Sequence, residues 1–219
     1  MAIQAIQTKY KGYRFRSRLE ARWAVFFDTL GIEWEYEKEG YQLSQIPLPP
    51  FEGAYRDEKK EDVFYLPDFY LPQFNCFVEV KNARPTQDEE IKAVRLVYYT
   101  QKNLLFVGAI PNESELGGIR LYEDSYIGEF ISYEHNLENL ACSQYYTNDF
   151  NHGWIGWDVP YYFCACTYCG KLSIQYQGRS ERINCCSDND REHKTYNYGS
   201  KRFFDAYRKA RSARFEHGE

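Results

Sequence analysis

The chain has 219 residues, and its content of 43% hydrophobic and 18% aromatic residues excludes a disordered chain. This length allows one hydrophobic core with a smaller appendage, or two domains. A net charge of -5 argues against a generally basic nucleic-acid coat protein, although basic residues are concentrated near both ends. The sequence has no apolar run long enough to cross a membrane and no apolar leader, so we expect a cytoplasmic protein without a membrane partner.

A helix is predicted over residues 17–30, because large apolar side chains recur there at helical spacing. Ser17 is expected to cap its N-terminus, with Glu20 three residues later as in a capping box, and Gly31 is expected to end it. Residues 32–37 alternate between apolar and polar side chains, which is typical of a strand.

A loop and two strands are expected next. Residues 44–62 contain three prolines and many charges, which favours a loop. Residues 63–71 and 76–81 are rich in aromatic and β-branched side chains and are predicted to be strands, joined by a turn at residues 72–75.

The following elements complete the predicted core. Thr86 is a suitable cap for a helix that runs to about residue 102, with acidic residues in its first turn. Residues 103–110 resemble a buried strand, one or two strands are expected near residues 119–131, and residues 201–215 form a basic helix. The order helix, strand, strand, strand, helix, strand up to residue 110 indicates a mixed α/β (α+β) fold.

Two acidic residues and a lysine stand out on the two strands expected over residues 63–81. Because side chains alternate along a strand, Glu79 and Lys81 share one face. Asp68 follows Pro67 on the preceding strand, and a hairpin would bring it beside Glu79. Hydrolysis of a phosphodiester bond uses hard cations, and Mg²⁺ takes oxygen ligands, few of them from protein. A neighbouring lysine can orient the attacking water or stabilise developing charge.

Pro67-Asp68 followed by Glu79-Val80-Lys81 resembles the motif of the PD-(D/E)XK nuclease superfamily, including the length of the intervening hairpin. The upstream segment, residues 15–37, is similar to the N-terminal helix of small phage and bacterial members. The ending, residues 206–219, also resembles the tail of phage nuclease-like proteins that carry this helix. The similarity covers residues 13–110 and extends to most of the chain through the tail.

This resemblance implies a restriction-endonuclease-like αβββαβ core with a mixed central sheet, dependence on Mg²⁺ or Mn²⁺, and cleavage of a DNA or RNA backbone. It also implies that the glutamate of the N-terminal helix, here Glu20, reaches the metal site. Independently, Glu20 lies at the border of the buried face of its helix, where a carboxylate is costly unless it is paired or metal-bound.

We therefore expect a Mg²⁺-dependent phosphodiesterase that cleaves DNA, and an endonuclease rather than an exonuclease. Glu20, Asp68 and Glu79 would bind one or two metal ions, the Val80 carbonyl would be a further ligand, and Lys81 would assist the attacking water. The alternative is a catalytically silent protein that binds nucleic acid, or acts between phage and host, on a nuclease scaffold. The resemblance places either protein in the cytoplasm of a bacterium or of a phage-infected host cell.

Five of the seven cysteines fall between residues 164 and 186, which in a reducing cytosol favours a metal site over disulfides. Cys166 and Cys169, followed by glycine, are typical of a zinc turn, and we expect structural Zn²⁺ on these two residues with Cys186. The fourth ligand is left open among three residues, Cys164, Cys185 and His193. A set of buried free cysteines is the alternative, and a disulfide is a weaker one.

Basic residues near both ends of the chain are candidates for phosphate contacts. A hairpin turning at residues 177–178 would expose two of them, and the helix of residues 201–215 displays others among aromatic side chains. The alternative for this helix is that it docks by its aromatic side chains and keeps a solvated basic face. The candidate nucleic-acid contacts are Arg14, Arg16, Arg18, Arg22, Arg179, Arg182, Arg208, Arg211 and Arg214.

Three segments are expected along the chain. They are a nuclease core at residues 1–135, a zinc-ribbon-like appendage at residues 136–199 and a C-terminal basic helix at residues 200–219. Because nucleases that cut duplexes and junctions often act in pairs, a homodimer is a further expectation.

Overall fold

The computed structural model describes residues 6–43, 63–83, 85–111, 127–131, 161–176 and 200–215. They belong to two compact units. The first unit comprises Met1–Tyr36, Ala109–Ser125 and Tyr161–Glu219, and the second comprises Glu37–Gly108 and Tyr126–Pro160. Each unit is therefore made of segments that are far apart in the sequence. Among the described residues, every helix is too short or too polar to cross a bilayer.

The first unit contains a hairpin that the sequence did not indicate. β1 (Thr8–Tyr10) pairs antiparallel with β2 (Tyr13–Phe15). Lys11 and Gly12 join them with φ angles of 50° and 82°. Positive φ at both central residues is the pattern of a type I′ turn, whose twist matches that of paired strands. Strands of three residues are too short for their alternation to be recognised in a sequence.

Helix α1 (Arg18–Leu30) confirms the predicted helix and both of its ends. The Ser17 hydroxyl accepts a hydrogen bond from the Glu20 amide at 3.1 Å, and Gly31 ends the helix in the left-handed region at φ 72°. The Glu20 carboxylate accepts a hydrogen bond from the Arg16 amide at 3.1 Å. In the expected capping box this carboxylate would accept from the Ser17 amide, and it accepts from the preceding residue, Arg16, instead.

The remaining elements of the first unit are β3 (Glu35–Tyr36), β10 (Tyr161–Ala165), β11 (Leu172–Tyr176) and α6 (Lys201–Ser212). β3 is shorter than the strand predicted over residues 32–37. β10 and β11 pair antiparallel, so the strand that pairs with β11 precedes it in the chain. The sequence predicts its partner after a turn at residues 177–178 instead, and that turn lies outside the described residues.

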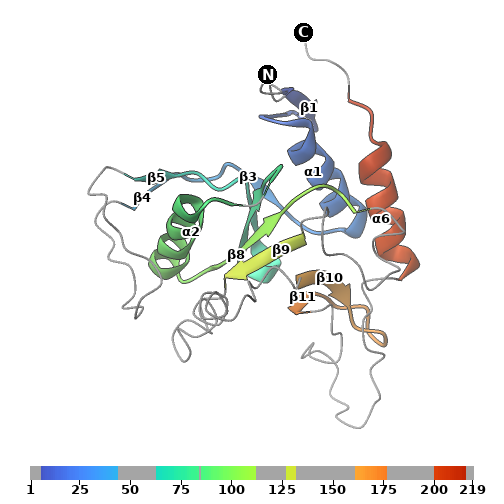
Figure 1. Ribbon diagram of the computed structural model, residues 1–219. Coiled ribbons are helices and arrows are strands. Elements are labelled where there is room, and N and C mark those ends of the chain that lie inside the picture. The colour runs from blue at the N-terminus through green and yellow to red at the C-terminus, as the bar shows by residue number, and fades with distance from the viewer. Residues whose placement is uncertain are drawn as a thin grey trace. The chain divides into compact units, whose positions relative to one another are not determined.

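The core of the first unit is aromatic, and α1 and α6 run side by side around it (Figure 1). The rings of Phe26 on α1 and Tyr207 on α6 stack with centroids 4.4 Å apart. Phe163 on β10 contacts the rings of Trp23, Phe26 and Phe27. Burial of such large rings stabilises the unit through the hydrophobic effect. The aromatic face of α6 is therefore docked, as one of the two interpretations of this helix expected.

The elements of the second unit are β4 (Tyr41–Gln42), β5 (Phe64–Tyr65), β6 (Phe69–Leu71), the 3₁₀ turn η1 (Pro72–Phe74), β7 (Cys76–Val80), α2 (Gln87–Thr100), β8 (Asn103–Val107) and β9 (Ile127–Ile131). β6, β7, β8 and β9 are neighbours in this order in one sheet. β7 is parallel to β8, while the β6–β7 and β8–β9 pairs are antiparallel. The chain thus has the mixed α and β composition and the mixed sheet that the sequence predicted.

The strand predicted over residues 63–71 is divided into β5 and β6. β5 pairs with β4, whereas β6 pairs with β7. Pro67 lies between them and has no amide hydrogen to donate to a ladder, which explains the interruption. The turn predicted at residues 72–75 is confirmed, with Asn75 in the left-handed region at φ 46°.

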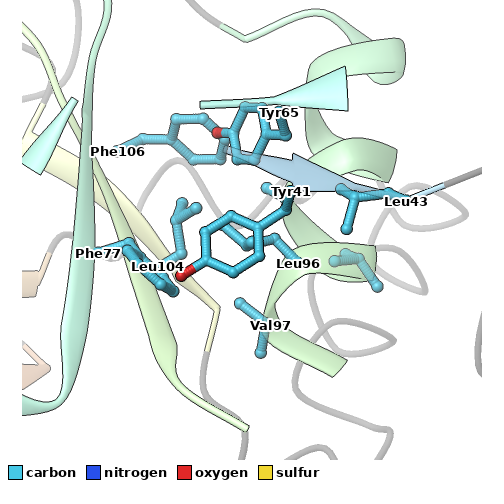
Figure 2. Close-up of a cluster of buried hydrophobic side chains, with 10 residues drawn as sticks. Tyr41, Leu43, Tyr65, Phe77, Leu96, Val97, Leu104 and Phe106 are labelled. Carbon is cyan, nitrogen blue, oxygen red and sulfur yellow. The ribbon is translucent and has the colours of Figure 1, made fainter. Parts of the chain in front are cut away.

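The apolar core of the second unit combines α2, β4, β5, β7 and β8 (Figure 2). Phe77 on β7 and Phe106 on β8 belong to this core, together with Leu96 and Val97 of α2. Glu79 lies two residues beyond Phe77 and is in register with Phe106. The sheet therefore directs Glu79 toward the same face as these rings, at the edge of the core.

Candidate functional site

Asp68 lies directly before β6, and Glu79 lies on the neighbouring strand β7. The register pairs Phe69 with Val78, so the residue before this pair on one strand and the residue after it on the other are Asp68 and Glu79. Asp68 is 3% exposed and Glu79 is 7% exposed. Buried carboxylates are costly unless other groups stabilise their charge. The contacts of these two side chains therefore decide what the site can do.

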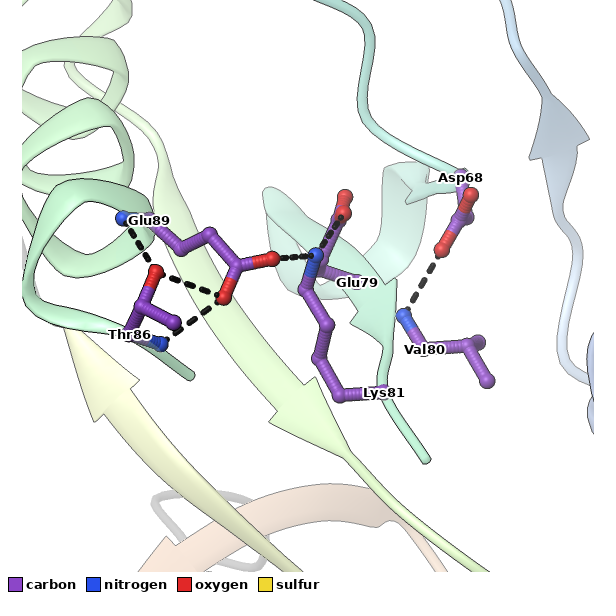
Figure 3. Close-up of polar contacts among 6 residues, drawn as sticks. All are labelled: Asp68, Glu79, Val80, Lys81, Thr86 and Glu89. Atoms are coloured by element: carbon purple, nitrogen blue, oxygen red, sulfur yellow. Dashed lines mark hydrogen bonds and ion pairs between the residues drawn. The ribbon is translucent and has the colours of Figure 1, made fainter. Parts of the chain in front are cut away.

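The Asp68 carboxylate is fixed by the backbone of the neighbouring strand. Its Oδ2 atom accepts a hydrogen bond from the Val80 amide at 2.7 Å (Figure 3). A hydrogen bond from an amide to a carboxylate is short and stronger than a bond between two neutral groups. Asp68 is thus held in one orientation beside the strand that carries Glu79.

Lys81, directly after β7, lies between two carboxylates (Figure 3). Its Nζ atom is 3.0 Å from Oε1 of Glu79 and 2.7 Å from Oε1 of Glu89. Burial alone would lower the pKa of Lys81, but the carboxylates of Glu79 and Glu89 outweigh burial, and the net pKa is raised. The side chain is therefore a positive charge at neutral pH and not a free base. The expectation that Glu79 and Lys81 share one face is confirmed.

Glu89 is a member of this cluster that the sequence did not indicate. It occupies the third position of α2, where its Oε2 atom accepts hydrogen bonds from the amide and the hydroxyl of Thr86. The Thr86 hydroxyl accepts in return from the Glu89 amide, which completes a capping box. In the sequence, a glutamate at this position is fully explained by the capping box, so it does not indicate a functional site. Only the fold shows that the other carboxylate oxygen reaches Lys81.

Tyr65 on β5 is a second residue that the sequence did not indicate. Its side chain is buried, and its hydroxyl lies near the Glu79 carboxylate. Burial raises the pKa of Tyr65, and the negative charges of Glu79 and Asp68 raise it further. The protonated hydroxyl is thus a donor close to both carboxylates.

The charges of the cluster favour a cation. The cluster contains the three carboxylates of Asp68, Glu79 and Glu89 and a single ammonium, that of Lys81, so its net charge is negative. Among the described residues no group of three or more His, Cys, Asp or Glu side chains could hold a metal ion. Mg²⁺ is usually bound through one or two carboxylates, with waters and substrate phosphates completing its six ligands. Asp68 and Glu79 fit that smaller requirement.

Glu20 lies in the first unit, whereas Asp68, Glu79 and Lys81 lie in the second. It is 6% exposed, and its Oε2 atom accepts hydrogen bonds from the Tyr36 hydroxyl at 2.6 Å and from the Arg16 amide at 3.1 Å. These contacts satisfy a buried carboxylate without a metal. The roles predicted for Glu20 and for the Val80 carbonyl as metal ligands stay predictions.

The cysteine candidates are partly described. Cys164 and Cys166 are buried, Cys169 is exposed, and none of the three forms a disulfide with another described residue. The remaining candidates, Cys185, Cys186 and His193, lie outside the described residues.

The basic candidates differ in their surroundings. Arg14, Arg16, Arg208 and Arg214 are exposed, whereas Arg18, Arg22 and Arg211 are half-buried. The Arg211 guanidinium donates a hydrogen bond to the Pro111 carbonyl at 2.9 Å. Arg211 thus has a structural contact that accounts for its position. Two candidates, Arg179 and Arg182, lie outside the described residues.

The two basic ends of the chain meet within the first unit. The ring of Tyr10 on β1 packs edge-on against the ring of Phe215, three residues beyond α6, with centroids 6.0 Å apart. Arg14 on β2 and Arg214 beside Phe215 are both exposed. The basic hairpin and the basic end of α6 are therefore neighbours.

Comparisons with protein-family models, with curated proteins and with solved structures find no significant match to this chain.

Proposed function

We propose that this chain is a metal-dependent nuclease that hydrolyses phosphodiester bonds of DNA, built on the αβββαβ core of the PD-(D/E)XK type. One observation carries the proposal. Two buried carboxylates lie at one end of the β6–β7 pair, Asp68 directly before β6 and bound to the Val80 amide, and Glu79 on β7 with Lys81 3.0 Å away. A binding surface alone would have no need of buried like charges, because their burial destabilises a protein unless a cation joins them.

Asp68 and Glu79 would hold Mg²⁺ or Mn²⁺, with the Val80 carbonyl as a further ligand. When bound, the metal would neutralise the scissile phosphate and promote ionisation of the attacking water. The Val80 amide keeps Asp68 oriented for this task. The Tyr65 hydroxyl, protonated and buried near both carboxylates, would donate to whichever oxygen the metal leaves available.

Lys81 would stabilise the negative charge that develops on the phosphate oxygens. Its raised pKa keeps it protonated at neutral pH, so it acts as a fixed positive charge rather than as a base. Glu89 would keep the ammonium in place when Glu79 turns to a metal ion, because Glu89 is anchored in the first turn of α2. Glu89 is thus a positioning residue in this proposal.

The exposed arginines of the first unit would contact the backbone of the substrate. Arg14 and Arg16 on the N-terminal side and Arg208 and Arg214 on the C-terminal side are the accessible candidates. Bound metal ions would make the acidic centre attractive to a polyanion, so binding should require divalent metal and low salt. The proposal also includes a homodimer and a role for Glu20 in the metal site.

The decisive experiment measures cleavage of duplex DNA, single-stranded DNA and RNA with and without Mg²⁺. Asp68→Asn and Glu79→Gln keep the shape of each side chain but remove its charge, and both should abolish cleavage. Asp88→Asn makes the same charge change at an exposed position on α2, next to Glu89, and should cleave as the wild type does. Full activity in both site variants would overturn the proposal. Metal-dependent binding without cleavage would favour the silent nucleic-acid-binding alternative.

A further inference from the structure

The turn between β10 and β11 has a tightly defined backbone. Ala165 and Leu172 form the last pair of the hairpin, and the Cys166 amide then donates to the Lys171 carbonyl at 2.9 Å. The Gly170 amide donates back to the Cys166 carbonyl at 3.0 Å. Gly170 has φ 72°, a left-handed conformation that favours glycine. Two backbone hydrogen bonds therefore hold Cys166 against Gly170 and Lys171 and close the turn that contains Cys169.

The sulfur of Cys166 receives a backbone hydrogen bond inside this turn. The Tyr168 amide points to Sγ of Cys166 at 3.4 Å. A neutral thiol is only a weak acceptor, whereas a thiolate is a good one, and cysteines that bind metal do so as thiolates. Amide donors to the ligating atoms also orient them and stabilise their charge. The backbone is thus arranged for a thiolate at Cys166.

Cys169 has no packing role that would explain a cysteine. It is exposed at the tip of the turn, as are its neighbours Thr167, Tyr168 and Gly170. Free cysteines are among the most buried residue types, and an exposed one is usually retained for its chemistry. A redox-active Cys-x2-Cys pair normally lies at the N-terminus of a helix, which lowers the thiol pKa. Here the pair lies in a hairpin turn, which is the arrangement of a zinc turn.

Cys164 belongs to the core instead. It is fully buried on β10, and the pKa of Tyr207 on α6 is raised by burial and then by the charge of the Cys164 thiolate. Full burial two residues before the turn favours a packing role for Cys164. We therefore do not assign it to the site at the tip of the turn.

We infer that Cys166 and Cys169 bind a structural Zn²⁺ ion at the tip of the β10–β11 hairpin. Zinc prefers four ligands in a tetrahedron, and two cysteines of one turn commonly supply half of them. The further candidates from the sequence, Cys185, Cys186 and His193, lie outside the described residues. The inference does not depend on the proposed nuclease activity, because a closed zinc site leaves no position for a substrate.

The test measures metal content in the full-length protein, purified without chelators, by elemental mass spectrometry. The wild type should carry about one Zn²⁺ per chain. Cys166→Ser and Cys169→Ser should lose this zinc, while Cys76→Ala, which removes a buried thiol in the second unit, should keep it. Because Cys169 is exposed, its replacement removes no core contact, and circular dichroism should show a folded variant.

A Co²⁺ titration of the metal-free protein provides a second readout. The wild type and Cys76→Ala should develop the near-ultraviolet absorption of cobalt–thiolate bonds, and Cys169→Ser should develop less of it. Cys164→Ala should keep the full band and the zinc. Zinc retained in a folded Cys169→Ser variant, iron in place of zinc, or a metal-free protein whose thiols at Cys166 and Cys169 react freely in the folded state would overturn the inference.

Discussion

Lys81 and Glu89 form an ion pair of 2.7 Å that joins the end of β7 to the first turn of α2. Glu89 uses one carboxylate oxygen for Lys81 and the other for the cap of its own helix. The start of α2 and the position of the Lys81 ammonium are therefore set by the same side chain. Because the two carboxylate oxygens of Glu89 have different partners, its contribution to the helix cap and its contribution to the proposed chemistry can be tested apart.

Glu89→Gln should keep the cap but weaken the hold on Lys81, because glutamine also serves at the third position of a capping box. The free energy of unfolding should fall by only about 0.2–1 kcal/mol, since the pair is partly exposed. If the proposed function holds, kcat should fall by roughly tenfold with KM little changed, as expected for a misplaced catalytic group. Chemical denaturation and steady-state cleavage measure the two effects. An equal loss in Asp88→Asn would show that the effect is not specific to Lys81.

The stability contributed by this pair should depend on pH at both extremes. Although burial opposes it, contacts with Lys81 and Thr86 lower the pKa of Glu89 from its ordinary 4.5, so the stability is present above pH 4.5 and is lost as the pH falls through the lowered value. The raised pKa of Lys81 means that its share is present below its ordinary 10.5 and is lost as the pH rises through the raised value. The difference in unfolding free energy between wild type and Glu89→Gln should thus be constant between about pH 5.5 and 9.5. A difference that changes within this window would contradict the ion pair.

Divalent metal should stabilise the folded chain through Asp68 and Glu79. An ion that binds only the folded state at 100 times its Kd adds about 2.7 kcal/mol to the free energy of unfolding. Asp68→Asn and Glu79→Gln should lose this gain, whereas Lys81→Gln should retain it because it removes a neighbouring positive charge. Thermal unfolding with and without Mg²⁺ measures the gain, and a full gain in Glu79→Gln would place the ion elsewhere.

Replacing Arg211 should have a different effect from replacing Arg208 and Arg214 together. Arg211→Gln should destabilise the first unit by about 1 kcal/mol, because it removes the hydrogen bond to the Pro111 carbonyl. The double variant Arg208→Gln/Arg214→Gln changes exposed side chains and should leave stability nearly unchanged. If these arginines contact phosphates, it should flatten the slope of log affinity against log salt by about 0.9 per contact. An unchanged slope would show that they only solubilise a docked helix.

Tyr207→Phe should leave the first unit equally stable or more stable. The Tyr207 hydroxyl is buried and has no hydrogen-bond partner among the described residues. Removing such a group removes a desolvation cost of about 1–3 kcal/mol while the ring keeps its stacking on Phe26. Thermal unfolding of the variant measures this, and a clear loss of stability would reveal a partner for the hydroxyl.

The elements with local signals could be predicted from the sequence. Ser17 and Gly31 mark the ends of α1, and Thr86 marks the start of α2, because caps are determined by neighbouring residues. Alternation along β7 also gave the shared face of Glu79 and Lys81. These predictions needed no information about the tertiary structure.

The contacts made between distant elements could not be predicted. The reach of Glu89 to Lys81 and the burial of the Tyr65 hydroxyl near Glu79 depend on how α2 and β5 pack on the sheet. The pairing of β10 with β11 was missed because the residues before the cysteines show no clear periodicity, whereas the residues after them resemble a hairpin.

The docking of α6 on α1 has a consequence for synthesis on the ribosome. Trp23, Phe26 and Phe27 are made early, but Tyr207 is made about 180 residues later, and the second unit lies almost entirely between them. At a synthesis rate of about 5–20 residues per second, the apolar face of α1 stays without its partner helix for on the order of ten to thirty seconds. The second unit can meanwhile complete its own core. A nascent chain of this protein should therefore present an aromatic helix to chaperones until translation is nearly finished.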